Sequence, residues 1–79
     1  MNWQHRIVCD PKILMGKPCV KGTRISVELI LGWLSADWSF EQILGSYPNI
    51  TRHDILAALA YAQELVHDDG ILPLVELPA

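Results

Sequence analysis

The sequence predicts a mainly α-helical fold in which three helices follow a short N-terminal β-arm and the last two helices form a helix-turn-helix. Residues 1–25 alternate β-forming triplets with turn-forming pairs, and residues 26–70 contain three helical segments with capping residues. A chain of 79 residues supports one hydrophobic core, so we expect a single domain over residues 1–70. Residues 71–79 form an apolar C-terminal tail.

The β-arm, residues 1–25, is predicted from three short segments of β-forming residues, at 7–9, 18–20 and 23–25. They are separated by pairs typical of turns, such as Asp10-Pro11 and Lys21-Gly22. An isolated hairpin is marginal in water, so the arm is expected to pack on the helices or to pair with its copy in a second subunit. Cys9 and Cys19 are expected to be reduced thiols in this sheet.

The first helix is predicted over Val27 to Ala36, with Ser26 as its N-cap. Its apolar side chains point nearly all round the axis, which requires burial on several sides. Asp37 is the expected stop, at a position where a left-handed backbone is less comfortable for aspartate than for glycine.

The helix-turn-helix is predicted from its capping residues. Ser39-Phe40-Glu41-Gln42 is a capping box that opens the second helix, and Tyr47-Pro48 closes it. Thr51 caps the third helix, Asp54 places a carboxylate in its first turn, and Gly70 ends it. One face of this helix is expected to be acidic, with Asp54, Tyr61, Glu64 and Asp68 along it.

The composition predicts a homodimer. Apolar residues make up 51% of the chain and charged residues 19%, below the roughly 25% that is usual for soluble domains. One small core cannot cover this much apolar surface, so part of it should face another protein. The candidate dimer interface lies on the first and third helices and comprises Ile30, Trp33, Leu34, Leu59 and Ala62.

Positive charge is concentrated at the N-terminus. Residues 1–25 carry five Lys and Arg against one Asp, a net charge of +4, whereas residues 26–79 carry one Arg against eight Asp and Glu, a net charge of −7. A polyanion would therefore contact the arm, for which the candidate DNA-binding residues are Lys12, Lys17, Lys21 and Arg24. Arg24 also has a structural interpretation, as a cation that bridges the arm to a carboxylate such as Glu28.

The turn before the third helix supplies a second group of candidate DNA-binding residues. Arg52 lies in the first helical turn, where a cation opposes the helix dipole unless a phosphate or base edge lies nearby. Helix pairs joined by a short turn are also common in purely structural cores, so this pattern is not specific. The candidates are Asn49, Thr51, Arg52 and His53.

The sequence indicates no enzyme, metal site or cofactor. His53 and His67 fall about 21 Å apart along one helix, too far to share an ion. The Gly16 to Thr23 stretch has the wrong glycine and lysine order for a phosphate-binding loop, and no nucleophile-base pattern is present. No apolar run is long enough for a membrane span or signal peptide, so the cytoplasm is the expected location.

Four stretches together closely resemble the prokaryotic domain-of-unknown-function family 433, over roughly residues 5–67. They are Asp10-Pro11, Gly16 to Val27, Tyr47 to Thr51 and Asp54 to Ala62, of which the Gly-Lys-Pro to Gly-Thr-Arg-Ile block is the most specific. The resemblance implies a homeodomain-like helix-turn-helix fold with an N-terminal β-arm. It also implies an antitoxin role similar to the VapB type, with a PIN-like ribonuclease as the toxin partner. Asp37 departs from the family, which commonly has glycine there.

Two functional hypotheses follow. In the first, the chain is a dimeric antitoxin of a type II toxin-antitoxin pair that contacts operator DNA and neutralises its toxin. In the second, it is a dimeric protein-interaction module with no nucleic-acid role. The tail has one charge in nine residues and is expected to bind either its own dimer or a different partner as an extended segment; its candidate contact residues are Ile71, Leu72, Leu74, Val75 and Leu77.

Overall fold

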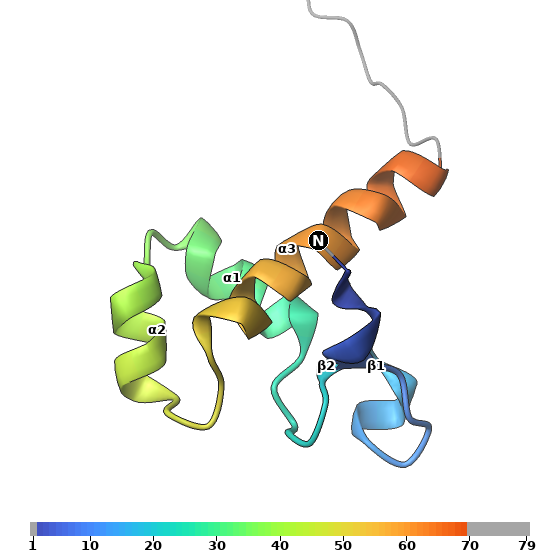
Figure 1. Cartoon of the computed structure of the whole chain (residues 1–79), viewed down its shortest axis with the longest axis horizontal. Helices are drawn as coiled ribbons and strands as arrows, with labels where there is room; N and C mark the ends of the chain where they lie inside the picture. The colour runs from blue at the N-terminus through green and yellow to red at the C-terminus, as the bar shows by residue number, and fades with distance from the viewer. Residues whose placement is uncertain (1, 70–79) are drawn as a thin grey trace, which may run out of the picture.

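The computed structural model describes residues 2–69 and is mainly helical, with three α-helices and one two-stranded antiparallel sheet (Figure 1). This confirms the predicted number of helices and the short N-terminal β-structure. The candidate partner residues of the tail lie outside the described residues. In chain order the elements are η1 (Trp3–His5), β1 (Ile7–Val8), η2 (Leu14–Gly16), β2 (Cys19–Val20), α1 (Val27–Ser35), α2 (Phe40–Ser46) and α3 (Arg52–Asp69), where η marks a 3-10 helix.

The sheet consists of β1 and β2, with Ile7 opposite Val20 and Val8 opposite Cys19. The strand predicted at 23–25 is wrong, because this segment closes a tight turn. The backbone N–H of Thr23 donates to Val20 O at 3.0 Å, and the Thr23 hydroxyl accepts from the Ile25 N–H at 2.9 Å. A threonine side chain that bonds the local backbone in this way competes with strand pairing. The expectation that both cysteines lie in the sheet is confirmed for Cys19, whereas Cys9 follows β1.

The first helix begins at Val27, as the sequence predicts, and ends at Ser35, one residue before the predicted Ala36, which is its C-cap. The Ser26 Oγ accepts from the Leu29 N–H at 2.9 Å. At the other end, the Trp38 N–H donates to Trp33 O and the Asp37 N–H donates to Leu34 O, both at 3.0 Å. These two bonds form a Schellman motif, in which Asp37 takes the left-handed conformation with φ of 71°.

Aromatic side chains cover much of the first helix inside the protomer. The Trp33 ring stacks on Trp38 with 5.8 Å between centroids and on Tyr47 with 4.3 Å. Ile30 is fully buried in the core, so its assignment to a dimer interface is wrong. Leu29 remains 43% exposed. The apolar surface that this helix leaves exposed is therefore smaller than the composition indicates.

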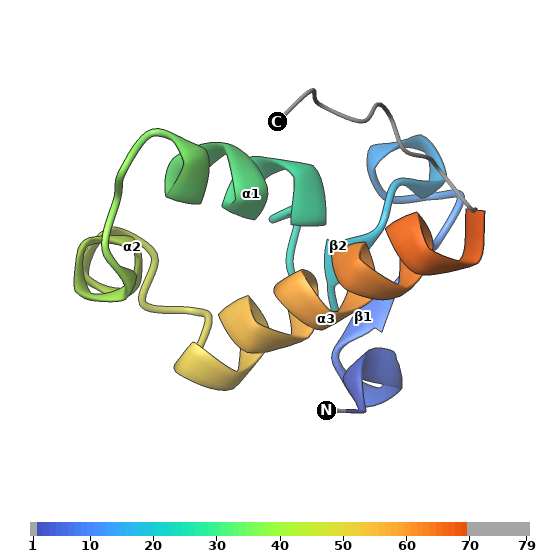
Figure 2. The same ribbon diagram turned by 90° about the horizontal axis from the view of Figure 1, so that it is seen from above.

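The third helix packs against α1, η1 and β1 (Figure 2). Figure 2 shows α1 and α3 side by side, with α2 at one end of the pair and the β-arm at the other. The small side chains of Ala57 and Ala58 are fully buried and allow this close packing. The core combines these alanines with isoleucines from each helix, Ile30, Ile43 and Ile55.

Both predicted caps of the helix-turn-helix are present. Ser39 and Gln42 exchange the two bonds of a capping box. At the start of α3, the Asp54 N–H donates to the Thr51 Oγ1 at 3.3 Å, and the Thr51 N–H donates to the Asp54 Oδ2 at 2.8 Å. Asp54 thus acts as the returning half of a second capping box, a role usually held by Glu or Gln.

The predicted acidic face of α3 is partly covered, because Asp54 is buried whereas Glu64 stays exposed. The Arg6 Nη1 donates to Asp54 Oδ1 at 3.0 Å, and Asp54 is 7% exposed. The Trp3 Nε1 donates to Glu64 Oε2 at 2.7 Å, while its ring meets Tyr61 edge-on at 4.8 Å. The N-terminal segment therefore binds this face and gives its carboxylates hydrogen-bond donors.

Asp37→Gly is expected to stabilise the protein by about 0.5–1 kcal/mol, because glycine adopts a positive φ without the Cβ clash that strains aspartate. Urea unfolding followed by circular dichroism measures the change. The control is Ala36→Gly, whose φ of −93° gives glycine no such advantage, so that variant should lose stability. Equal effects of the two substitutions would contradict the assignment of strain to Asp37.

Candidate nucleic-acid interface

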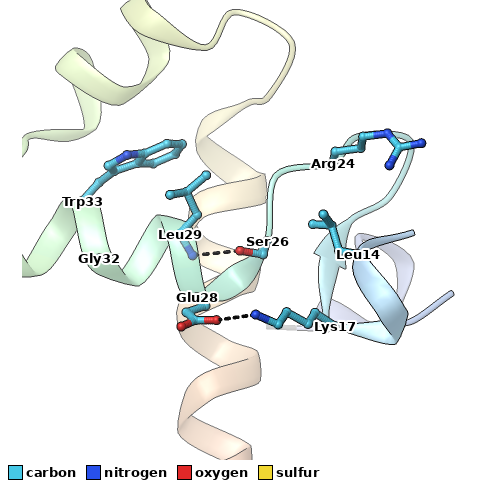
Figure 3. A pocket seen from close by; sticks show the side chains of 8 residues that line it. All are labelled: Leu14, Lys17, Arg24, Ser26, Glu28, Leu29, Gly32 and Trp33. Carbon is cyan, nitrogen blue, oxygen red and sulfur yellow. Dashed lines mark hydrogen bonds and ion pairs between the residues drawn. The ribbon is translucent and has the colours of Figure 1, made fainter. Parts of the chain in front are cut away.

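A cleft lies between the η2 loop of the arm and one side of α1 (Figure 3). Its volume is about 460 Å³. Leu29 and Trp33 form one wall and Leu14 faces them from the arm, while the Arg24 side chain extends away from α1 along the far rim. The complete lining comprises Leu14, Lys17, Arg24, Ser26, Glu28, Leu29, Gly32 and Trp33.

One ion pair crosses this cleft. The Lys17 Nζ lies 3.3 Å from Glu28 Oε1, and their side chains are 57% and 79% exposed. Within the described residues Glu28 pairs with this lysine, so the bridge expected between Arg24 and Glu28 is wrong. An exposed pair of this kind contributes little to stability and can exchange Glu28 for another anion. Lys17 is therefore available to a ligand at small cost.

A second hollow adjoins the cleft and shares three of its residues. It has a volume of about 450 Å³ and is lined by Pro11, Lys12, Leu14, Met15, Lys17 and Arg24. The structure thus brings together three of the four predicted arm cations, and this hollow has no carboxylate in its lining. Lys21 is exposed in the turn before Gly22 and lines neither hollow.

The loop that carries these cations has an unusual backbone. Leu14 and Met15 have φ of 50° and 57°, a region that non-glycine residues seldom occupy. Met15 is 89% exposed as a result. Sequence reasoning missed Leu14 and Met15 as surface residues; the signal was the apolar Ile13-Leu14-Met15 run beside Gly16, inside a segment otherwise rich in turn residues.

Three loops project from the same side of the molecule, at the lower edge of Figure 1. They are the η2 loop in light blue, the 21–25 turn in teal and the 47–51 connection between α2 and α3 in yellow. The loops that carry the arm cations and the α2–α3 connection therefore lie on the same side of the molecule. The C-terminal end of α3 points to the opposite side.

The four candidate residues at the start of α3, Asn49, Thr51, Arg52 and His53, are exposed, although two of them already have partners inside the protomer. The Arg52 guanidinium lies over the Phe40 ring at 4.7 Å from its centroid. This cation–π contact gives the cation in the first turn an explanation without DNA. The Thr51 hydroxyl accepts the cap bond, which leaves Asn49 and His53 as the exposed polar groups with no side-chain bond shown.

Apolar side chains remain exposed outside this interface. Of the candidate dimer residues, Leu59 is 37% exposed, while Trp33, Leu34 and Ala62 are half-buried. Sequence reasoning missed Leu65 and Val66, which are 48% and 56% exposed on the last turns of α3. Their apolar character was visible in the sequence, but their exposure depends on how far α1 extends beside α3.

The two cysteines differ in environment. Cys9 is exposed and Cys19 is buried. Burial raises the pKa of the Cys19 thiol, with a further increase from Cys9 and an opposing decrease from Arg24. Within residues 2–69 no group of His, Cys, Asp and Glu could hold a metal ion. No helix in this described part is long and apolar enough to cross a membrane.

Comparison with known proteins identifies the family. The model of the family described as "Protein of unknown function (DUF433)" matches residues 7–62, which include the arm from β1 onward, α1, α2 and most of α3. The chain belongs to the DUF433 family. It is also similar to a solved DUF433 member protein from Anabaena variabilis ATCC 29413, with 25% sequence identity and a TM-score of 0.75 over 82% of this chain.

The resemblance to the Anabaena DUF433 member is partial in length. The matched region covers 64% of that protein, so this chain spans less than two thirds of it. No curated protein matches the chain.

Proposed function

We propose that this DUF433 protein is a homodimeric, antitoxin-like module with a homeodomain-like helix-turn-helix, which binds operator DNA and neutralises a PIN-like ribonuclease toxin in the cytoplasm. In this proposal it has no catalytic activity and no cofactor. The observation that carries the DNA half is the arrangement of the arm cations. Lys12, Lys17 and Arg24 line adjoining hollows on the loops that face the same side as the α2–α3 connection.

Electrostatics divides the proposed interface into two parts. Exposed cations on the arm attract phosphates over a distance of about one Debye length, so they would supply most of the affinity. The first turn of α3 would contribute base contacts through Asn49 and His53, since Thr51 is used as a cap and Arg52 lies over Phe40. DNA binding would thus depend more on the arm than on the recognition helix.

The DNA half predicts a salt dependence that the arm controls. With a fluorescent duplex from upstream of the protein's own coding sequence, Lys12→Gln with Lys21→Gln should lower the log-log slope of affinity against salt by about 1.8, because each lost phosphate contact removes about 0.9. The control, Gln4→Glu with Gln63→Glu, changes the net charge equally at exposed positions outside the three loops. It should leave the slope unchanged.

Two results would contradict this interface. One is failure of the unmodified protein to bind the duplex at 50 mM salt, the low end of the range over which such contacts are strong. The other is equal slopes for the arm variant and its control, which would show only a general effect of net charge.

The toxin half rests on the apolar composition of the tail and on the family resemblance, and is tested by co-expression with the protein encoded by the neighbouring gene. The unmodified chain should co-purify with it. Leu74→Asp with Leu77→Asp should abolish co-purification, because each carboxylate would be desolvated in an apolar contact. The arm variant Lys12→Gln with Lys21→Gln serves as the control and should co-purify normally. Equal recovery of the tail variant would contradict the proposal.

The alternative function, a dimeric protein-interaction module without a nucleic-acid role, is favoured by the exposed leucines. Leu29 and Leu59 are apolar surfaces on different helices that a partner could cover. Absence of DNA binding together with retained co-purification would support this alternative over the first proposal.

A further inference from the structure

An apolar groove runs between α1 and the C-terminal half of α3, away from the arm cleft. Its volume is about 220 Å³. Pro18 borders it from the arm, Val27 and Leu31 from α1, and Tyr61, Ala62 and Leu65 from α3, while Glu28 is the one charged residue in its lining. The groove is an outward continuation of the core, because Val27, which lines it, belongs to the buried core set.

The groove is open because α3 is twice as long as the helix beside it. α3 has 18 residues and α1 has 9. The last turns of α3 therefore extend past the body of the molecule, as both views show (Figures 1 and 2). Leu65 and Val66 on these turns are 48% and 56% exposed. Because burial of apolar surface is favourable, these exposed side chains and the groove beside them favour contact with another apolar segment.

The end of α1 shows how this chain covers apolar side chains in the last turn of a helix. The residue four places before Asp37 is Trp33, and the residue after Asp37 is Trp38, whose ring stacks on Trp33. An apolar contact between these two positions, the third residue from the end of the helix and the second residue after its C-cap, usually accompanies a Schellman motif.

The same spacing recurs at the end of α3. Val66 precedes Gly70 by four residues, and Ile71 follows Gly70 directly. Glycine is the residue that best fits the left-handed position of the motif. The sequence beyond it is apolar, with one charge in residues 71–79, and Pro73 has no N–H that would need a partner in an apolar groove.

We propose that residues 71–74 of this chain fold back over the end of α3 and occupy the groove. Ile71 would then contact Val66, and Leu72 and Leu74 would lie over Leu65 and Ala62. The reach is sufficient. Tyr61, at the far end of the groove, lies eight residues before Asp69, about 12 Å along the helix. Five residues of extended chain span about 16 Å. This docking does not depend on DNA binding and describes the chain without its partner, since Ile71, Leu72 and Leu74 are also candidate toxin contacts and a toxin would have to displace them.

Hydrogen exchange in the full chain, without DNA or partner, tests the docking. The amides of Leu72 and Leu74 should exchange about tenfold more slowly than in an unstructured peptide. Leu65→Ser should remove this protection, because it takes an apolar wall from the groove. Leu59→Ser is the control, since Leu59 is exposed on α3 but does not line the groove. It should leave the protection intact.

A second variant distinguishes loss of docking from unfolding of α3 caused by the Leu65 substitution. Ile71→Ser lies beyond α3 and should also remove the protection of Leu72 and Leu74, while the helical circular dichroism signal stays unchanged. Unprotected amides in the unmodified chain would overturn the proposal, as would equal protection in Leu65→Ser and Leu59→Ser. Isotope-filtered contacts between the methyl groups of Leu74 and Leu65 in a mixed-labelled sample would overturn docking within one chain, because they would place the segment on a second copy.

Discussion

The carboxylate of Asp54 joins the start of α3 and the adjacent α2–α3 connection to the segment before β1, which lies 48 residues away in the sequence. One oxygen accepts the backbone N–H of Thr51 at 2.8 Å, and the other accepts the Arg6 guanidinium at 3.0 Å. With 7% exposure, a carboxylate without these donors would pay a large desolvation penalty. The start of α3, the α2–α3 connection and the segment before β1 therefore have to keep their relative positions.

The contact between Arg6 and Asp54 fixes the position of the arm relative to the α2–α3 connection. Arg6 directly precedes β1, and β1 pairs with β2, so the loop between the strands is fixed relative to α3. Trp3 adds a second attachment through Glu64 and Tyr61. A two-stranded hairpin would be marginal alone, and these contacts replace the second subunit as its support. In the proposed DNA interface, the arm cations would therefore act together with the α2–α3 connection without a rearrangement on binding.

Local chemistry explains which elements the sequence predicts well. The caps of all three helices involve residues three or four positions apart, so Ser26, Ser39 and Thr51 identify the helix starts without tertiary information. The predictions that failed concern surfaces whose exposure is set by contacts between residues far apart in the sequence. On α3, Glu64 accepts a hydrogen bond from Trp3, 61 residues away. On α1, stacking of Trp33 on Tyr47 reduces the exposed apolar surface. In the candidate site, the clustering of cations on the arm was predictable from the sequence. The shape of the two hollows was not, because Leu14 and Met15 beside them have positive φ values, which the preferences of non-glycine residues disfavour.

The most direct test of the Asp54 constraint is a double-mutant cycle with Arg6→Ala and Asp54→Ala, measured by urea unfolding. Because the arginine side chain is 39% exposed, the account predicts a coupling energy of about 1 kcal/mol instead of the larger value of a buried pair. Additive effects of the two substitutions, within about 0.3 kcal/mol, would contradict it. The arm would then be held by other contacts, and the carboxylate would serve the helix cap alone.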